Sequence, residues 1–174
     1  IETTTAVSSY ISSGDVSSTE NTDTESKTTD DTGLFTDRDL EQTADLSESV
    51  TLAPKSGEDL AITEAGVYVL SGTYEDVTVI VEAADDAKVQ LVLDGYHVDN
   101  VDAPAIFIKS GDKVFITSTD SENSLSVTGA FITDGETNLD AVIFSKSDFV
   151  LNGVGTVQIT SAQGNAVSSK DDLK

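Results

Sequence analysis

Short apolar, β-branched runs recur along the chain and are separated by polar turns. The runs are rich in Val, Ile, Phe and Thr, and each ends in Gly, Asp, Asn or Ser. They read VYVL from Val67, VTVIVEA from Val77, VQLVLDG from Val89, AIFI from Ala105, KVFIT from Lys113, AVIF from Ala141, FVLNG from Phe149 and TVQIT from Thr156. No window has a helical period, and both prolines lie between runs. The pattern predicts an all-β protein of many short strands, which is compatible with a sandwich, a barrel or a solenoid.

An internal repeat favours the solenoid. With Asp112, Asp148 and Asp172 in register, AIFIKSGDKVFI falls over AVIFSKSDFVLN and then over NAVSSKDDLK, with steps of 36 and 24 residues. One coil of a parallel β-helix needs roughly 20 to 25 residues, so the shorter step fits a plain coil. The longer step fits a coil with an insertion, which we place at Thr133 to Asp140. We therefore predict a right-handed parallel β-helix over residues 34–174.

Like residues stack on like between such coils, so the repeat also predicts a row of charged side chains on the surface. The members of this row are Lys109, Lys146 and Lys170, alternating with Asp112, Asp148 and Asp172. Such a row is typical of a stabilising, solubilising surface.

Residues 1–33 differ in composition from the rest. Sixteen of them are Ser or Thr, seven are Asp or Glu, and their apolar positions are too sparse for a core. We interpret this part as an extended Ser/Thr-rich acidic tail or tether. An alternative is that the stretch TTAVSSYI is a strand that docks on a partner. Residue 1 is Ile rather than Met, which agrees with the removal of a signal or leader.

Charge excludes several classes of partner. The formal net charge is -23, and nine basic residues cannot form the basic stripe that DNA, RNA or anionic lipid requires. No apolar run approaches the roughly 20 residues of a membrane span. The absence of Cys excludes a disulfide framework and a thiolate metal site.

Five stretches together carry a family resemblance. They are LFTDRDLEQTADL from Leu34, AGVYVLSG from Ala65, VQLVLDG from Val89, NLDAVIFSKSDFVLNGVGTV from Asn138 and NAVSSKDDLK from Asn165. In this order they resemble the bacterial carbohydrate-binding domain-containing proteins, which are exported, often lipid-anchored parallel β-helices similar to polysaccharide lyases. The resemblance covers residues 34–174. It implies a cell-surface or extracellular location, polysaccharide as partner, and further coils beyond residue 174.

We expect no catalysis. Polysaccharide lyases of this architecture use calcium and an Arg or Lys base, but Arg38, the only arginine, lies between two acids and is better explained as a structural ion pair. Paired carboxylates are uninformative among 32 acids. We expect His97, the only histidine, to be a turn residue rather than an acid or base.

The resemblance and the residues favour a non-catalytic, calcium-stabilised polysaccharide-binding protein. Exposed aromatic rings commonly bind sugars, and the candidates are Tyr74 and Tyr96 with His97, which sit in the turns SGTYED and DGYHVDN. Packing at a corner is the alternative for both tyrosines. The competing function is a surface fibre or matrix protein that assembles through its open β edges, with the tail as a possible donor strand.

A calcium site is predicted in the insertion. The sequence DGETNLD places oxygen-bearing side chains at every second residue, at Asp134, Glu136, Asn138 and Asp140. Such spacing lets a short loop surround a hard cation that needs six to eight oxygens. Asp120 and Glu122 are the candidates to complete the shell. The alternative is an ordinary acidic loop in which Asp and Asn form turns.

Overall fold

The computed structural model describes residues 33–174. The tail predicted for residues 1–33 therefore lies outside the described residues, apart from Gly33, and so does the candidate donor strand TTAVSSYI. Assembly through that strand stays a prediction.

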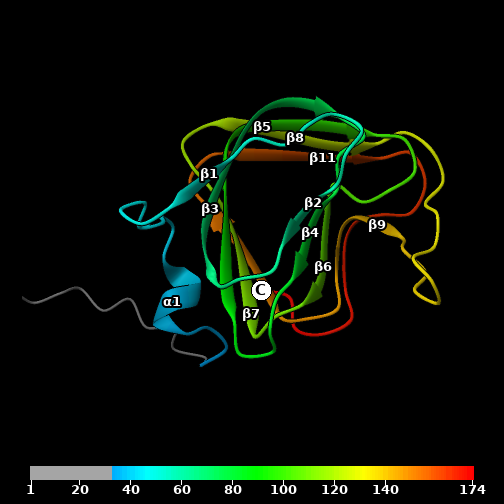
Figure 1. The fold of residues 1–174 in the computed structure, drawn as a ribbon. Coiled ribbons are helices and arrows are strands. Elements are labelled where there is room, and N and C mark those ends of the chain that lie inside the picture. Colours follow the sequence, from blue (N-terminus) through cyan, green and yellow to red (C-terminus); the bar gives the residue numbers. More distant parts are fainter. Residues whose placement is uncertain (1–32) are drawn as a thin grey trace, which may run out of the picture.

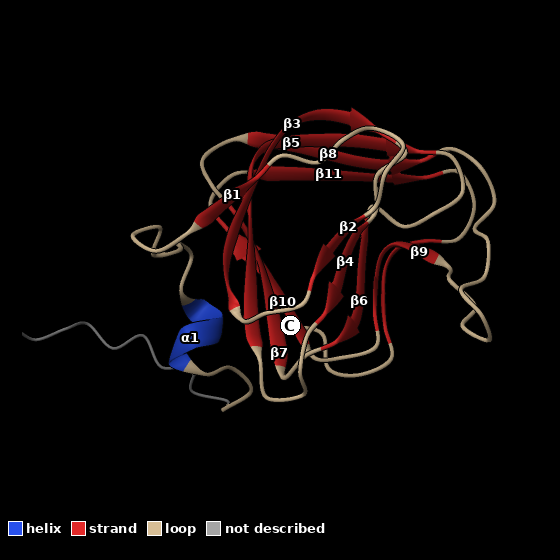
Figure 2. Cartoon of the chain, in the orientation of Figure 1, coloured by secondary structure: helices blue, strands red, loops and turns tan. Residues whose placement is uncertain are grey.

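All regular elements of the described chain are β-strands except one short helix (Figure 2). In chain order it forms α1 (Asp37–Leu40), β1 (Val50–Leu52), β2 (Leu60–Ile62), β3 (Gly66–Glu75), β4 (Val79–Glu82), β5 (Lys88–Asn100), β6 (Ile106–Ser110), β7 (Lys113–Ser118), β8 (Glu122–Val127), β9 (Ala141–Ser145), β10 (Phe149–Gly153), β11 (Thr156–Ser161) and β12 (Asn165–Ser169). The all-β class predicted from the short apolar runs is confirmed.

Two sheets make up the fold, and their strands pair in parallel (Figure 1). The seven-stranded sheet has the order β1-β3-β5-β7-β10, and β8 joins it by pairing with β5 and with β11. The five-stranded sheet has the order β12-β9-β6-β4-β2. The α1 helix lies outside the sheets, beside the lower part of β3 and β7 in Figure 1.

The prediction of a right-handed parallel β-helix is wrong, because the described strands form two parallel sheets and not a closed solenoid. The repeat spacing cannot distinguish these two architectures. It measures only the number of residues between one strand and its parallel neighbour, and open parallel sheets have such spacings too. Strand β5 continues for 13 residues and pairs first with β7 and then with β8. The short-coil prediction required a turn within that stretch.

The strand register agrees with the repeat only in part. The 24-residue step is confirmed, since Asn165 pairs with Ala141 and Leu173 forms a bridge with Phe149. The 36-residue step is not observed. Ile106 pairs with Ile143, a step of 37 residues, and Val114 pairs with Phe149, a step of 35 residues. The first step is one residue longer than predicted and the second is one residue shorter.

The lysine row exists, but it lies on aromatic rings. The Nζ atoms of Lys109 and Lys146 lie 5.2 Å and 5.7 Å from the centre of the Phe107 ring, and that of Lys170 lies 5.4 Å from the Phe144 ring. The two rings pack edge to face. Cation–π contacts thus hold this row in place on the outer side of the five-stranded sheet.

The core lies between the sheets and is built from every second strand residue. Leu91 and Leu93 of β5 meet Ile106 and Ile108 of β6 within one apolar cluster. Burying apolar area of this kind supplies most of the stabilisation of a fold. Residues that alternate with these in sequence, such as Val92, point to the opposite, outer face of the sheet, and Val92 is buried on that face too.

Candidate functional site

The helix α1 begins at a capping box. The Thr36 hydroxyl accepts a hydrogen bond from the Asp39 backbone N–H at 3.3 Å, and the Asp39 carboxylate accepts one from the Thr36 N–H at 3.0 Å. Such a box satisfies two N–H groups that the first helical turn leaves without partners. It also fixes the direction of the Asp39 side chain.

Asp39 connects this short helix to the sheet. Its side chain is completely buried, and its Oδ1 and Oδ2 atoms lie 2.5 Å and 3.5 Å from the ammonium groups of Lys113 and Lys174. Burial alone would raise the pKa of Asp39. The hydrogen bonds from Lys113 and Thr36 outweigh burial and lower the pKa to about 2. The carboxylate is therefore ionised throughout the physiological range.

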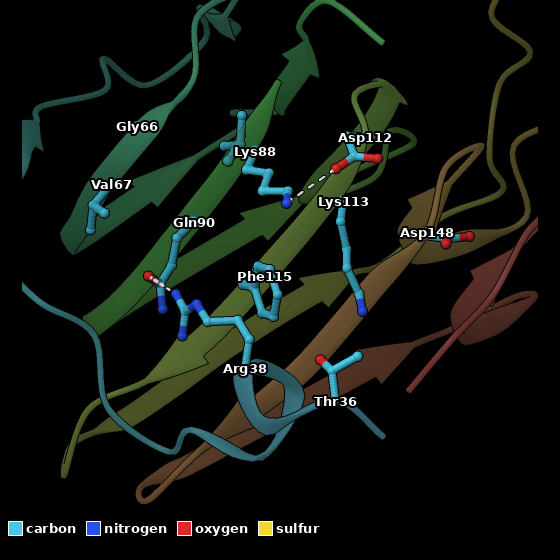
Figure 3. A pocket seen from close by; sticks show the side chains of 11 residues that line it. Thr36, Arg38, Gly66, Val67, Lys88, Gln90, Asp112, Lys113, Phe115 and Asp148 are labelled. Atoms are coloured by element: carbon cyan, nitrogen blue, oxygen red, sulfur yellow. Dashed lines mark hydrogen bonds and ion pairs between the residues drawn. The ribbon is translucent and has the colours of Figure 1, made fainter. Parts of the chain in front are cut away.

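Arg38 lies flat against the outer face of the seven-stranded sheet. Its guanidinium carbon is 4.5 Å from the centre of the Phe115 ring, and Nη2 donates to Oε1 of Gln90 at 2.6 Å (Figure 3). Nη1 pairs with Glu41 at 2.6 Å. Arg38 thus forms an ion pair with Glu41, three residues further along, rather than with the flanking Asp39, which faces Lys113 and Lys174.

A hollow of about 500 Å³ opens beside α1, over strands β3, β5 and β7. Its charged and amide side chains surround the Phe115 ring (Figure 3). The lining residues include Arg38, Lys88, Gln90, Lys113, Asp112 and Asp148. Lys88 Nζ and Asp112 Oδ2 are 3.7 Å apart at the exposed rim, so their pairing is weak. The hollow therefore offers both donors and acceptors to a polar ligand.

A polar row crosses three neighbouring strands, β5, β7 and β10, on the same sheet face. Nε2 of Gln90 donates to Oγ1 of Thr117 at 2.8 Å, and Thr117 donates to Oδ1 of Asn152 at 2.7 Å. The Asn152 Nδ2 atom donates to the backbone carbonyl of Glu41 at 2.9 Å. Sequence reasoning missed this row. The side chains of a strand alternate between its two faces. In VQLVLDG, KVFIT and FVLNG this alternation places Gln90, Thr117 and Asn152 on the face opposite the core, so the sequence contained a signal for the row.

A second hollow, of about 320 Å³, lies on the other side of the N-terminal segment. It is lined by Gln42, Thr43, Ala44, Leu46, Val92, Thr117, Ser118, Thr119, Asp120 and Val154. The first hollow borders α1 and its N-cap, and the second borders the residues that follow the helix.

The three predicted sugar-binding residues lie away from both hollows. Tyr96 is fully buried in the core, and burial raises the pKa of its hydroxyl. Its ring cannot contact a sugar, so Tyr96 is removed from the candidates. Tyr74 is half-buried, packs against Tyr96 at 5.8 Å between ring centres, and donates to the Ser71 carbonyl at 2.9 Å. Nδ1 of His97 lies 2.8 Å from the hydroxyl of Ser124. Sugar binding by Tyr74 and His97 stays a prediction.

The predicted calcium ligands are dispersed. Asp134 pairs with Lys109 at 3.1 Å, and a tight turn closes between Asp134 and Thr137. Oδ1 of Asp140 is buried without a hydrogen-bond partner. Glu136, Asn138, Asp120 and Glu122 are exposed. Within residues 33–174 no three His, Asp or Glu side chains gather as a metal site would require. Calcium binding by this set stays a prediction.

Comparison with known proteins identifies the family. The family model described as carbohydrate-binding domain-containing protein matches residues 56–174. A carbohydrate-binding domain-containing protein of Acetivibrio thermocellus is 30% identical over 122 residues, which are 68% of this chain and 43% of that protein. A solved structure, the polysaccharide lyase-like protein from C. thermocellum in its gadolinium derivative, superposes with a TM-score of 0.62 at 30% identity. The match covers 69% of this chain and 50% of that one.

The parallel two-sheet fold defines an all-β protein that is similar to the polysaccharide lyase-like protein. The chain belongs to the carbohydrate-binding domain-containing family, as its sequence resemblance predicted. It spans about half the length of the relatives that it matches. No helix in the described part of the chain is long and apolar enough to cross a membrane.

Proposed function

We propose that this chain is an extracellular, non-catalytic polysaccharide-binding protein, and that the hollow beside α1 contacts the sugar. Membership of a carbohydrate-binding domain-containing family supports polysaccharide as the partner. Export is supported by the same resemblance and by the acidic, Ser/Thr-rich composition of residues 1–33. Stabilisation by calcium is a separate part of the proposal, with its own test in the Discussion.

The observation that carries the proposal is the mixture of groups around the hollow. Sugar hydroxyls both donate and accept hydrogen bonds, so a site for them needs donors and acceptors close together. Lys88 and Lys113 supply donors, and Asp112 and Asp148 supply acceptors. These residues come from strands of one sheet and from the turns just before them, so the backbone holds them rigidly.

The state of Arg38 supports binding without catalysis. An arginine that acts as a general base must have its guanidinium group free to face the substrate. Arg38 is instead engaged by Glu41, Gln90 and the Phe115 ring. His97 is hydrogen-bonded to Ser124 and does not line the hollow.

A depletion assay on insoluble cellulose and on pectin tests the proposal. We expect the full chain to be retained more strongly than an unrelated acidic protein on at least one of the two. We expect Lys88→Ala to weaken retention about tenfold, equivalent to about 1.4 kcal/mol, because one donor at the rim is lost. Lys55→Ala is the matched control, since Lys55 is also exposed and paired with an acid, Glu58. Retention of the wild type no greater than that of the unrelated protein would contradict the proposal.

A further inference from the structure

The sheet face beneath the N-terminal segment has the make-up of a binding surface. We call it the outer strip, and it consists of Gln90, Val92, Phe115, Thr117, Val150 and Asn152 on β5, β7 and β10. The segment that lies on it, residues 36–43, we call the cover. Neither Phe115 nor Val92 belongs to the core cluster between the sheets, although each is less than 5% exposed. Arg38 of the cover lies over the Phe115 ring, and Gln42 and Thr43 of the cover line the second hollow together with Val92.

The cover occupies the groups that a sugar would use. A sugar ring presents a flat face to an aromatic ring and hydroxyl oxygens to amides. The planar guanidinium of Arg38 lies on the Phe115 ring and hydrogen-bonds to Gln90. The amide of Asn152 donates to the carbonyls of Asp39 and Glu41, at 3.3 Å and 2.9 Å.

The two hollows end at the cover. The first is lined by Gln90 and Phe115, and the second by Val92 and Thr117, all four from the outer strip. Removing the cover would join the hollows into one groove across three strands. A sugar bound in the first hollow can extend into the second only if the cover moves aside.

Most of the cover is exposed, and Asp39 is the only buried residue between positions 34 and 46. Opening the cover therefore requires mainly the separation of Asp39 from Lys113 and Lys174 and the loss of the hydrogen bonds to Gln90 and Asn152. The rest of the segment has few buried contacts to lose. The cover also lies outside the part of the chain that matches the family model, which begins at residue 56.

We propose that the outer strip extends the sugar-binding surface of the first hollow and that residues 36–43 compete for it from within the same chain. This inference rests on the proposed function, because it assumes that the ligand is a polysaccharide. The apparent affinity for the sugar is then the intrinsic affinity of the open strip multiplied by the fraction of molecules in which the cover is open.

The test weakens the cover and leaves the strip intact. Arg38→Ala combined with Gln42→Ala removes the contact with Phe115 and the hydrogen bond from the Gly153 N–H to Gln42. We expect this variant to bind insoluble cellulose or pectin about fivefold to tenfold more tightly than the wild type. The control variant is Lys55→Ala combined with Gln158→Ala, which also removes one positive charge and one amide, but at exposed positions outside the cover and the outer strip. It should bind like the wild type.

Three outcomes separate the two proposals. Tighter binding of the Arg38 and Gln42 variant supports the cover. Equal or weaker binding, with the wild type still retained, overturns the cover and leaves the proposed function standing. If neither protein is retained, both proposals fail.

Hydrogen exchange on the wild type provides a check that needs no variant. With the chain saturated by soluble hydroxyethylcellulose, or by polygalacturonate for pectin, the amides of residues 36–43 should exchange faster, because the sugar displaces the cover. Unchanged or slower exchange there in the presence of bound sugar would overturn the inference.

Discussion

Asp39 and Lys113 form an ion pair across 74 positions of sequence, with Oδ1 and Nζ 2.5 Å apart. This pair connects a one-turn helix to the first residue of β7. The carboxylate has no exposed surface, and its second oxygen faces Lys174 at 3.5 Å. A single buried acid thus anchors the cover to the sheet.

Asp39→Asn should destabilise the protein. The change removes a buried negative charge that faces two lysines, and it leaves their ammonium groups without this partner. We expect the free energy of unfolding to fall by about 1 to 3 kcal/mol. Glu58→Gln is the control, because it breaks the exposed pair with Lys55 and should cost less than about 1 kcal/mol. Denaturant unfolding of both variants measures the difference. Equal losses would show that Asp39 is not an anchor.

The contribution of Asp39 should depend on pH in a definite direction. Its pKa is about 2 in the folded protein and has an ordinary value of 3.8. A lowered pKa means that the stabilisation is complete above the unfolded value and is lost as the pH falls through the folded value. The stability difference between the wild type and Asp39→Asn should therefore be constant from pH 7 to 5 and shrink by up to about 2 kcal/mol towards pH 2. Denaturant titrations at pH 6 and pH 2 compare them, and a difference that does not change with pH would contradict the assignment.

Several strands could be predicted because their apolar residues alternate with a period of two. The run beginning at Phe149 became β10 with the same bounds, and the run beginning at Val89 became the first part of β5, which starts one residue earlier and continues to Asn100. Strand β8, which reads ENSLSV, was missed because its outward residues are small and polar and look like a turn. The repeat gave the separation between strands, but not the closure of the sheets, because the same separation occurs in open sheets.

The site was predictable only in part, since it depends on contacts between distant residues. Tyr96 was placed in a turn because Asp94 and Gly95 precede it. The structure instead continues β5 through Gly95, which adopts a φ of +69°, and this sends the tyrosine ring into the core. Phe115 belongs to the apolar run KVFIT, yet it is buried under the cover rather than between the sheets. No local pattern shows that residue 38 will meet residue 115.

Asn100→Ala should be among the most damaging single changes outside the apolar core. The side chain of Asn100 accepts from the Val77 N–H at 2.9 Å and donates to the carbonyls of Val77 and Pro104, both at 3.0 Å. Alanine would leave these buried backbone groups without partners, at about 1 to 3 kcal/mol for each group that water cannot reach. We expect a loss of at least about 2 kcal/mol in denaturant unfolding. The exposed amide of Gln158 is the control, and Gln158→Ala should change stability by less than about 0.5 kcal/mol. Similar small losses for both would show that the Asn100 bonds add little.

Calcium binding by the loop at residues 134–140 makes a prediction that the structure sharpens. If calcium binds only the folded state, the melting temperature should rise with the logarithm of free calcium, and Asp134→Ala with Asp140→Ala should abolish the rise. The unpartnered Oδ1 of Asp140 is available as a ligand. Asp134 is not, because Lys109 holds its carboxylate at 3.1 Å and competes with the cation.

Lys109→Ala should therefore move the calcium response to lower concentration, because the loop no longer has to break an ion pair before it binds. Lys146→Ala is the matched control. It removes an ammonium group from the same row, 5.7 Å from the Phe107 ring, without touching the pair between Lys109 and Asp134. Both lysine variants make the net charge more negative by the same amount, so a general electrostatic attraction of calcium would affect both equally. A calcium response that shifts only for Lys109→Ala therefore identifies Asp134 as a ligand. Melting curves in EDTA and across micromolar to millimolar calcium measure the shift. If the melting temperatures of the wild type and of Lys109→Ala are the same in EDTA and in millimolar calcium, the loop does not bind calcium. Its acidic residues then serve only as turn formers on the surface.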